Sequence, residues 1–469
     1  MVTNWNNTFD RKGEFETYYP ITYIKDGINA NNIIDNSDCL FVNNKFKTSF
    51  KGVLLKVTKI INNRLYFKYR LDCEVQYDTK YDTSISGWYL LNKDVSHKLI
   101  IQPDIMEEDN YSATLDVIIG KVYDLIKDFR TDENDASVII TKERIIKWIN
   151  QFDKDDHIFL LNELLEIFSK RYYSKASIED LLVAMIESLC AKYEYSDKSA
   201  FLYDAVFLDL QSNGKSQKVL LKILGGILKN KYSFDINDCG KNGKKYFIYL
   251  DDILCTGNTL FQNIKDWSSE KYNTKFTNKE AIKNNLAKLV FVYIFNHIKN
   301  CNKKLNEFEI KIDETFSNNI DVMNRIYIQN LESDSKSALD IVLPLNNPKD
   351  KFVEEYRKSI VEQVNEYIDG KYSVNDEFYR PDGMPKSEIL FTSKENRDRF
   401  ENIILKKGIE ILKKANISKI NVRSLGFALP SHKNFGFGTL CFTWRNVPNN
   451  TPLVFWYKGG GFFPLFVKR

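Results

Sequence analysis

Hydrophobic positions recur along the chain with different periods, and each period predicts a different kind of element. Between about residues 18 and 101, runs such as GVLLKVTKI and RLYFKYRLDCEVQY alternate in short β-type segments separated by Asn, Asp and Gly. From 112 to 190 the period is near 3.6, as in KERIIKWINQF, which is typical of helices. We therefore expect a mostly antiparallel β domain over 1–110 and a helical region over 111–195.

One helix in that region has a sequence signal for its start. The stretch SIEDLLVAMIESL opens with Ser177 and carries Asp180 three residues later, which is close to a capping box. We therefore predict that this helix begins at Ser177.

From residue 196 onward, strand-like and helix-like segments alternate. The apolar runs AVFLDL, YFIYL and KLVFVYIFNHI have strand length, and QKVLLKILGGILKN and LFQNIKDW have a helical period between them. This alternation is expected of a parallel sheet whose strands are joined by helices. We predict an α/β domain over 196–469, with two further charged helices in DKFVEEYRKSIVEQVNEYI and RDRFENIILKKGIEIL.

The run YFIYL is followed directly by two acids, Asp251 and Asp252, and then by the turn CTGNT. Adjacent carboxylates lose solvation when covered and repel each other, so we expect something to be bound there. Ligands of parallel sheets bind beyond the carboxyl ends of the strands. A Thr/Gly turn at a helix N-terminus favours a phosphate, and carboxylates favour vicinal hydroxyls or a hydrated divalent cation. Together these features predict a ribose 5-phosphate ligand.

The stretch YFIYLDDILCTGNT resembles the phosphoribosyl-pyrophosphate signature of the type I phosphoribosyltransferases. Only Cys255 departs, because that family usually has Ser, Thr or Ala there. The resemblance implies that Asp251 and Asp252 hold the ribose hydroxyls. It implies that the 5′-phosphate is held by the turn, which comprises Cys255, Thr256, Gly257, Asn258 and Thr259.

An earlier loop, LDLQSNGKSQ, lies between a predicted strand and a predicted helix, where that family holds its pyrophosphate. The candidate residues in this loop are Gln211, Gly214, Lys215 and Ser216, with Lys215 as the cation for the diphosphate. The family reaction breaks the bond from C1 to pyrophosphate through an oxocarbenium-like state. It uses Mg²⁺ held mainly by the ligand's oxygens, and Asp251 and Asp252 are the protein groups that the resemblance offers to it.

A closer resemblance joins several segments. KWINQF, LQSNGKSQ, LDDILCTGNT, NVPNNTPLVFW and FFPLFVKR together are similar to a phosphoribosyltransferase-like domain of bacterial conflict systems, over roughly residues 142–469. The resemblance implies an α/β fold with a parallel-sheet type I phosphoribosyltransferase-like core, preceded by the helical layer and the β domain. It also implies an effector that transfers or hydrolyses a phosphoribosyl group in anti-phage defence.

A second function stays open beside that one. The same site could bind phosphoribosyl pyrophosphate or a nucleotide without turnover, so that the chain is a sensor or regulatory subunit whose β domain docks a partner protein. Only the residues KYSFDINDCGKNGKK separate the helix before the acid pair from its strand, which is a short space for the loop that usually shields this reaction from water.

Two competing interpretations of the acid pair are weaker. SNGKS and YFIYLDD resemble parts of the two Walker motifs, but a full P-loop has glycine where this chain has Asp209. A simple helix cap does not require two acids, two threonines and a glycine in this order.

The bulk composition changes this picture little. The net charge of +4 favours no particular partner, and the seven cysteines and four histidines lack the spacings of disulfide frameworks or zinc sites. No signal peptide or membrane-length apolar run is present, so we expect a cytoplasmic protein without a membrane partner.

Two further features could bear on function. His297 ends a predicted strand and could face the cleft, although a lone histidine there is more often structural. From residue 411 onward the chain has no acid but nine Lys or Arg among many aromatic residues, which fits either a nucleic-acid surface or, as we prefer, the buried end of the enzyme fold.

Overall fold

The structure is a computed structural model that describes residues 103–133, 135–330 and 339–468, together with five strands nearer the start of the chain. The chain divides into two compact units, Met1–Asp116 and Val117–Arg469. Helix α3 (Pro103–Ile126) contains the division between them. No helix within the described residues is both long enough and apolar enough to cross a membrane.

The five described strands of the first unit form an antiparallel sheet in the order β1-β4-β3-β5-β2. These strands are β1 (Tyr19–Ile21), β2 (Cys39–Phe41), β3 (Phe50–Ile61), β4 (Arg64–Val75) and β5 (Trp88–Leu91). The rest of 1–102 lies outside the described residues, so the predicted β domain over 1–110 stays a prediction.

The predicted helical region contains three helices after α3, namely α4 (Lys142–Ile149), α5 (His157–Arg171) and α6 (Lys175–Lys192). The predicted start of the last one is wrong. Helix α6 begins two residues earlier, at Lys175, because Ser174 is its N-cap and the Ser174 hydroxyl accepts a hydrogen bond from the Ser177 backbone N–H at 3.1 Å. The sequence offers two serines in this stretch, and only the backbone geometry selects between them.

A four-stranded, fully parallel sheet forms the centre of the second unit, as the alternation of segments predicts. Its strand order is β10-β9-β8-β7. The strands are β7 (Ala205–Phe207), β8 (Tyr246–Leu254), β9 (Lys288–His297) and β10 (Ile320–Ile328). The segments around them are α7 (Lys198–Asp204), α8 (Ser216–Tyr232), α9 (Asn258–Ser268), α10 (Asn278–Lys283) and α11 (Ile298–Lys311).

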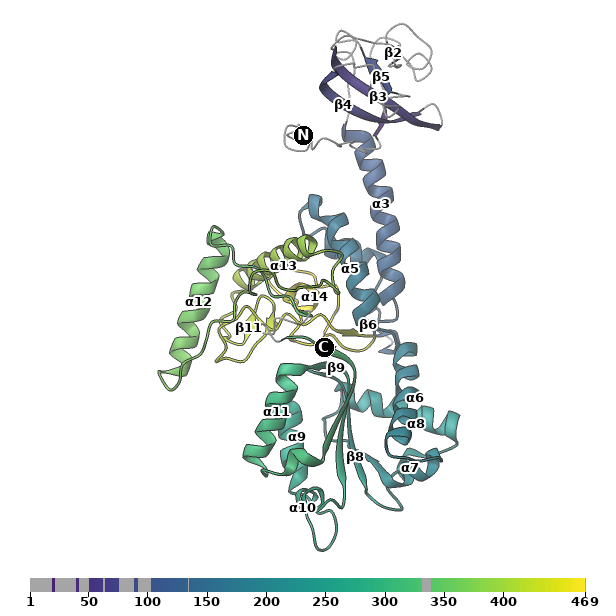
Figure 1. Ribbon diagram of the computed structural model, residues 1–469, viewed down its shortest axis with the longest axis vertical. Helices are drawn as coiled ribbons and strands as arrows, with labels where there is room; N and C mark the ends of the chain where they lie inside the picture. Colours follow the sequence, from purple (N-terminus) through teal and green to yellow (C-terminus); the bar gives the residue numbers. More distant parts are fainter. Residues whose placement is uncertain are drawn as a thin grey trace. The chain divides into compact units, whose positions relative to one another are not determined.

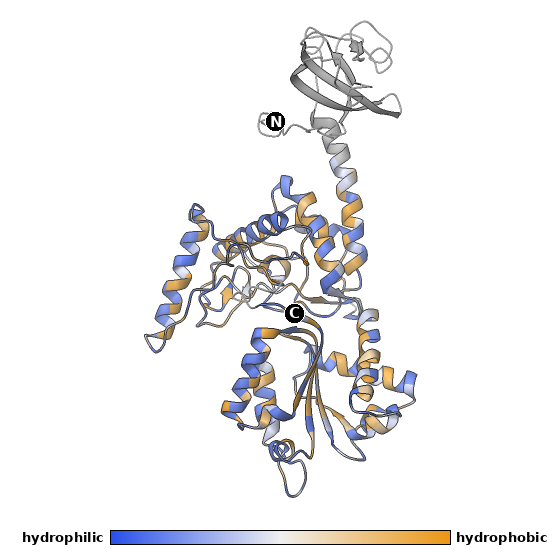
Figure 2. Ribbon diagram, viewed as in Figure 1, coloured by the Kyte–Doolittle hydropathy of each residue, from blue (hydrophilic) through white to orange (hydrophobic). Residues whose placement is uncertain are grey.

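Helices cover both faces of this sheet. Helices α6, α7 and α8 pack on one face against Ile248 and Leu250, and α9, α10 and α11 pack on the other against Tyr249 (Figure 1). In Figure 2, strands β8 and β9 are mostly hydrophobic, whereas α9 and α11 carry hydrophilic residues as well. A strand that is buried on both faces has a continuous apolar sequence, which is why β8 and β9 could be predicted.

Two strand boundaries differ from the sequence-based prediction. Strand β7 ends at Phe207, three residues before the predicted end, and β8 continues through both acids to Leu254. Asp251 therefore lies beside Tyr293 inside the sheet, not after its end. The prediction ended β8 too early because charged residues are rare within a central strand.

The C-terminal segment packs at the carboxyl ends of the sheet strands. It contains α12 (Lys351–Ile368), α13 (Lys394–Ala415), β11 (Val422–Arg423), β12 (Gly426–Phe427), β13 (Phe442–Thr443) and α14 (Leu453–Trp456). Strand β13 pairs in parallel with β6 (Tyr172–Tyr173), and the Trp148 indole N–H donates to the Val454 carbonyl at 2.7 Å. These contacts join the segment to α4 and α5.

The basic, aromatic end of the chain is largely core. Phe435, Trp444 and Trp456 are buried, and the buried Arg423 guanidinium donates to two backbone carbonyls, those of Ile420 and Asn434. These rings and this cation are therefore part of the folded unit, in agreement with the structural interpretation of the acid-free stretch.

Candidate functional site

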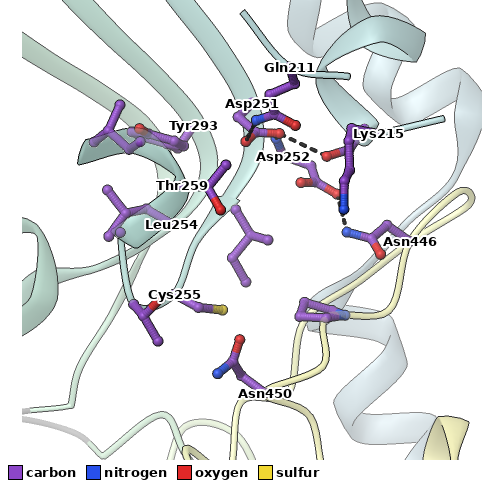
Figure 3. Close-up of a pocket in the computed structure, with 16 residues that line it drawn as sticks. Gln211, Lys215, Asp251, Asp252, Leu254, Cys255, Thr259, Tyr293, Asn446 and Asn450 are labelled. Carbon is purple, nitrogen blue, oxygen red and sulfur yellow. Dashed lines mark hydrogen bonds between the residues drawn. The ribbon is translucent and has the colours of Figure 1, made fainter. Parts of the chain in front are cut away.

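A cavity of about 200 Å³ opens where β8 ends and where α8 and α9 begin (Figure 3). Its remaining wall is a turn of the C-terminal segment. The lining residues come from these four places and, for Tyr293, from β9; they are Gln211, Lys215, Ser216, Asp251, Asp252, Ile253, Leu254, Cys255, Thr256, Gly257, Thr259, Leu260, Tyr293, Asn446, Pro448 and Asn450.

Nine of the eleven site residues proposed from the sequence line this one cavity. They are Gln211, Lys215, Ser216, Asp251, Asp252, Cys255, Thr256, Gly257 and Thr259. The other two, Gly214 and Asn258, belong to the same two loops but do not line the cavity. Gly214 has a φ of +85°, which suits glycine, and the Asn258 side chain is bound by Lys304.

The N-termini of two helices converge on the cavity without a side-chain cap. Lys215 is the N-cap of α8 and Gly257 is the N-cap of α9, and neither offers a side-chain acceptor to the first-turn N–H groups. The first N–H groups of a helix have no intrahelical partner and favour an anion. Two such ends at one cavity therefore suit a ligand with two anionic groups.

Two side chains of α11 hold the turn at residues 255–259 in place. Asn300 donates to the Cys255 carbonyl at 2.6 Å, and the buried Lys304 ammonium donates to Asn258 Oδ1 at 2.7 Å and to Glu307 at 2.6 Å. Gly257 has a φ of +71°, and a Cβ there would stand 2.5 Å from Cγ of Lys304. Only glycine therefore fits at this position.

The two acids have different surroundings. Asp251 accepts hydrogen bonds from the Gln211 amide at 2.6 Å, the Ser216 hydroxyl at 2.8 Å and the Asp252 backbone N–H at 2.9 Å. Burial, followed by the charge of Asp252, raises the pKa of Asp251 to about 8. Burial and the neighbouring charge thus favour the protonated form of Asp251, against the three hydrogen bonds that its oxygens accept.

The Asp252 carboxylate is hydrogen-bonded to the opposite wall of the cavity. Asn446 donates to Asp252 Oδ2 at 2.8 Å, across 194 residues of sequence. Within the described part of the chain, no protein group hydrogen-bonds the other carboxylate oxygen. Lys215 extends into the same space, toward Asn446 (Figure 3). Asp252 is thus the carboxylate that offers an oxygen to a ligand.

Several site residues were not found from the sequence. Asn446 lies in the NVPNN stretch, which the sequence analysis quoted only as part of a resemblance. Gln217 and Tyr249 underlie the acid pair, and Gln211 donates to the Tyr249 hydroxyl at 2.8 Å. Gln217 could be noticed in the sequence only as a polar residue within an otherwise apolar helical pattern. Asn446 has no such signal, because its role depends on a contact with Asp252, 194 residues away.

His297 does not line the cavity. It is fully buried at the end of β9, and its Nε2 lies 3.0 Å from the Thr439 hydroxyl. Burial, with Arg171 nearby, lowers the pKa of His297 to about 3, so the imidazole is neutral. This agrees with the structural role that we considered more typical.

The donor set fits a magnesium ion held mainly by a ligand. Among the residues that the structure describes, no three His, Cys, Asp or Glu side chains are grouped so as to hold a metal ion. Mg²⁺ commonly uses one or two carboxylates together with phosphate oxygens and water. Asp252, with one oxygen toward the cavity, meets that requirement.

A parallel α/β sheet with an acid pair and two uncapped helix N-termini at its carboxyl end is the arrangement expected of a phosphoribosyltransferase-like protein. Comparison with protein families agrees, because the PRTase-CE model matches residues 145–468, which is more than half of the chain. This chain therefore belongs to the PRTase-CE family of phosphoribosyltransferase-like effectors. No curated protein and no solved structure matches it.

Proposed function

We propose that this protein binds phosphoribosyl pyrophosphate or a nucleotide together with Mg²⁺, and transfers or hydrolyses the phosphoribosyl group in the bacterial cytoplasm as an anti-phage effector. One observation carries the proposal. A carboxylate and two uncapped helix N-termini face a single cavity, and a ribose with phosphates at both ends presents groups of matching character.

Each side of the cavity suits one part of such a ligand. The turn at Thr256–Thr259 suits the 5′-phosphate, and the N-terminus of α8 with Lys215 suits the pyrophosphate. Asp252 would accept hydrogen bonds from the ribose hydroxyls and stabilise the positive charge that develops on the ring. Bound Mg²⁺ would neutralise phosphate charge, with Asp252 as its protein ligand.

In the proposed reaction, the bond from C1 to the pyrophosphate oxygen breaks, and its electron pair leaves with pyrophosphate. A nucleophilic atom of the acceptor, or the oxygen of water, forms the new bond to C1 and releases its proton to solvent. The segment 231–245 contains the end of α8 and a single 3-10 turn, Ile236–Asp238, and no additional strand. A site without a cover from this segment favours water or a large acceptor.

Binding and turnover are tested together. The purified protein is titrated calorimetrically with phosphoribosyl pyrophosphate and Mg²⁺, and pyrophosphate release is then measured with and without cell extract. We expect binding and release by the wild-type protein, with binding weakened and the rate of release lowered by roughly 10²–10³ in Asp252→Asn. Absence of any binding by the wild-type protein would overturn the proposal.

A second candidate is a nucleotide sensor that binds without turnover and docks a partner protein through its β domain. It is favoured by the hydrogen bonds of Asp251, whose two oxygens already accept three from Gln211, Ser216 and Asp252. Asp251 then has less capacity to act on a bound ribose. Binding in the calorimeter with no pyrophosphate release under any condition supports this candidate instead.

A further inference from the structure

Strands β7 and β8 separate just before the site. Their parallel pairing runs from Ala205 beside Tyr246 to Phe207 beside Ile248, and the Leu208 N–H still donates to the Ile248 carbonyl at 2.8 Å. In a continued parallel ladder, the Leu210 N–H would next donate to the Leu250 carbonyl. That bond is not made, so both groups need other partners.

The side-chain amide of Gln217 takes the place of this missing rung. Its Oε1 accepts the Leu210 N–H at 2.9 Å, and its Nε2 donates to the Leu250 carbonyl at 3.2 Å. The same Oε1 also accepts the Gln211 N–H at 2.9 Å. Gln217 is fully buried on α8. One planar amide therefore bridges two strands that have moved apart.

This insertion creates the space in which the site is built. Because the loop after Leu210 is held away from β8, the Gln211 side chain reaches down to the Tyr249 hydroxyl and to Asp251. Ser216, which precedes Gln217 in α8, donates a hydrogen bond to the same Asp251 carboxyl. Gln217 thus fixes the loop that carries Lys215 relative to the acid pair.

We propose that Gln217 is a positioning residue that couples the pyrophosphate-side loop, residues 209–215, to the acid strand β8. The inference rests on the proposed function, since it assigns that loop to the pyrophosphate group. Gln217 touches no ligand itself. Its loss frees the backbone N–H groups of Leu210 and Gln211 and lets Lys215 move, so it weakens pyrophosphate binding while the 5′-phosphate turn stays intact.

The chemistry requires glutamine at this position. Leucine has a similar size but removes both the acceptor and the donor. Glutamate keeps acceptor oxygens for the loop N–H groups but, when ionised, cannot donate to the Leu250 carbonyl. The effects should therefore be graded, with Gln217→Leu more severe than Gln217→Glu.

The experiment uses the full chain and two readouts. Hydrogen exchange is followed in peptides that cover 208–215, and binding of inorganic pyrophosphate and of ribose 5-phosphate is measured with Mg²⁺. In Gln217→Leu we expect the Leu210 and Gln211 amides to exchange at least about tenfold faster, because these two lose their acceptor. We expect pyrophosphate binding to weaken about tenfold or more, with ribose 5-phosphate binding changed less than about threefold.

The control is Gln363→Leu, which alters an exposed glutamine on α12 and should change neither readout. If Gln217→Leu does not fold, Gln217→Glu carries the same test with a smaller expected loss. Unchanged exchange and unchanged pyrophosphate binding in a folded variant would overturn the inference. Failure of the wild-type protein to bind either ligand would instead count against the proposed function.

Discussion

At the scale of single residues, the two neighbouring acids of the signature have different hydrogen-bond partners. Asp252 has an oxygen available in the cavity, whereas Asp251 is held by Gln211 and Ser216. The sequence analysis assigned both to the ribose hydroxyls, which is what the resemblance implied. The hydrogen bonds of the described structure favour Asp252 as the main ligand group.

Replacing Asp252 by Asn should therefore lower the rate of pyrophosphate release by roughly 10²–10³, because a charge aimed at the developing cation is lost. The reaction is followed by a pyrophosphate assay at saturating Mg²⁺. The melting temperature should hardly change, since Asn446 can still hydrogen-bond the new side chain. A variant that stays fully active contradicts the role given to Asp252.

Asp251 should make stability depend on pH. Its carboxyl has a pKa of about 8 in the folded chain, well above the value of about 4 for an unfolded aspartate. The folded state therefore binds this proton more tightly. The resulting stabilisation is complete below about pH 4 and is lost as the pH rises toward 8.

Asp251→Asn removes this dependence. Relative to the wild-type protein, the variant should gain melting temperature steadily as the pH is raised from about 5 to about 8. Thermal unfolding in a series of buffers measures the difference. Asp209→Asn, on the exposed part of the neighbouring loop, is the matched control and should show no such trend. A constant difference between Asp251→Asn and wild type would show that Asp251 is ionised throughout.

The cavity residues that lie in contiguous sequence motifs were predictable, and those whose place depends on long-range contacts were not. The turn Thr256–Thr259 and the loop with Lys215 lie beside the acid pair in the structure. The residue types and their order in two short motifs were enough to identify them. Asn446 and Gln217 could not be found in that way, because an amide in a turn or in a helix is ordinary until its hydrogen-bond partner is known.

At the scale of elements, the start of α9 is the most constrained part of the site. Gly257 combines a left-handed backbone with a neighbour, Lys304, that is itself fixed by Asn258 and Glu307. Because Lys304 is buried and held at its ammonium end, it cannot move aside freely.

Gly257→Ala should destabilise the protein by about 2–3 kcal/mol, of which about 1–2 kcal/mol is backbone strain and the rest is the clash with Lys304. Gly214→Ala provides the matched control, because Gly214 also has a positive φ but nothing lies within 4 Å of an added Cβ. That variant should lose only the strain, about 1–2 kcal/mol. Urea denaturation measures the free energy of unfolding of both variants. Equal losses of stability would mean that the Lys304 side chain moves aside without an energetic penalty.

The elements that the sequence revealed are those with a continuous apolar run or a strong helical period. Strand β9, buried along nearly its whole length, and the amphipathic α13 were both expected from their patterns. Strand β10 was missed, because it lies at the sheet edge and most of its side chains are only half-buried. An edge strand has no continuous apolar run to mark it.

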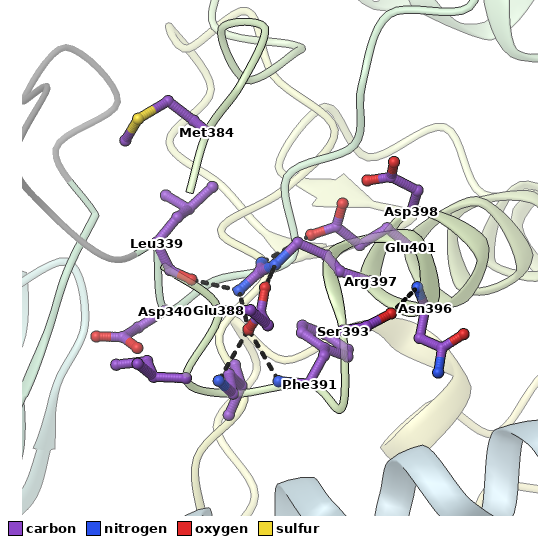
Figure 4. Close-up of polar contacts among 12 residues, drawn as sticks. Leu339, Asp340, Met384, Glu388, Phe391, Ser393, Asn396, Arg397, Asp398 and Glu401 are labelled. Carbon is purple, nitrogen blue, oxygen red and sulfur yellow. Dashed lines mark hydrogen bonds and ion pairs between the residues drawn. The ribbon is translucent and has the colours of Figure 1, made fainter. Parts of the chain in front are cut away.

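At the scale of the second unit as a whole, a buried network of charges joins distant segments (Figure 4). Arg397 on α13 pairs with Glu388 at 2.6 Å and with Glu401 at 3.0 Å. Arg380 forms a second ion pair with Glu401. Arg397 also donates to the carbonyls of Leu339 and Ile341.

Arg397→Met should destabilise the protein by about 3–5 kcal/mol, because it leaves Glu388 and Glu401 buried with fewer partners. Burial already raises the pKa of Glu401, which shows the cost of charge at this position. The control is Arg399→Met on the same helix. Arg399 is half-exposed and pairs with Asp156, so about 0–1 kcal/mol is expected. Denaturant unfolding measures the loss of stability in each variant. Similar losses in both would contradict a stabilising role of the buried network.

The contact between Asn446 and Asp252 has a consequence for the synthesis of this protein. The ribosome makes the acid pair nearly two hundred residues before the turn that closes the other side of the cavity. A nascent chain, or one cut short by premature termination, therefore carries the motif without the wall. The complete cavity therefore forms only after translation has passed that turn.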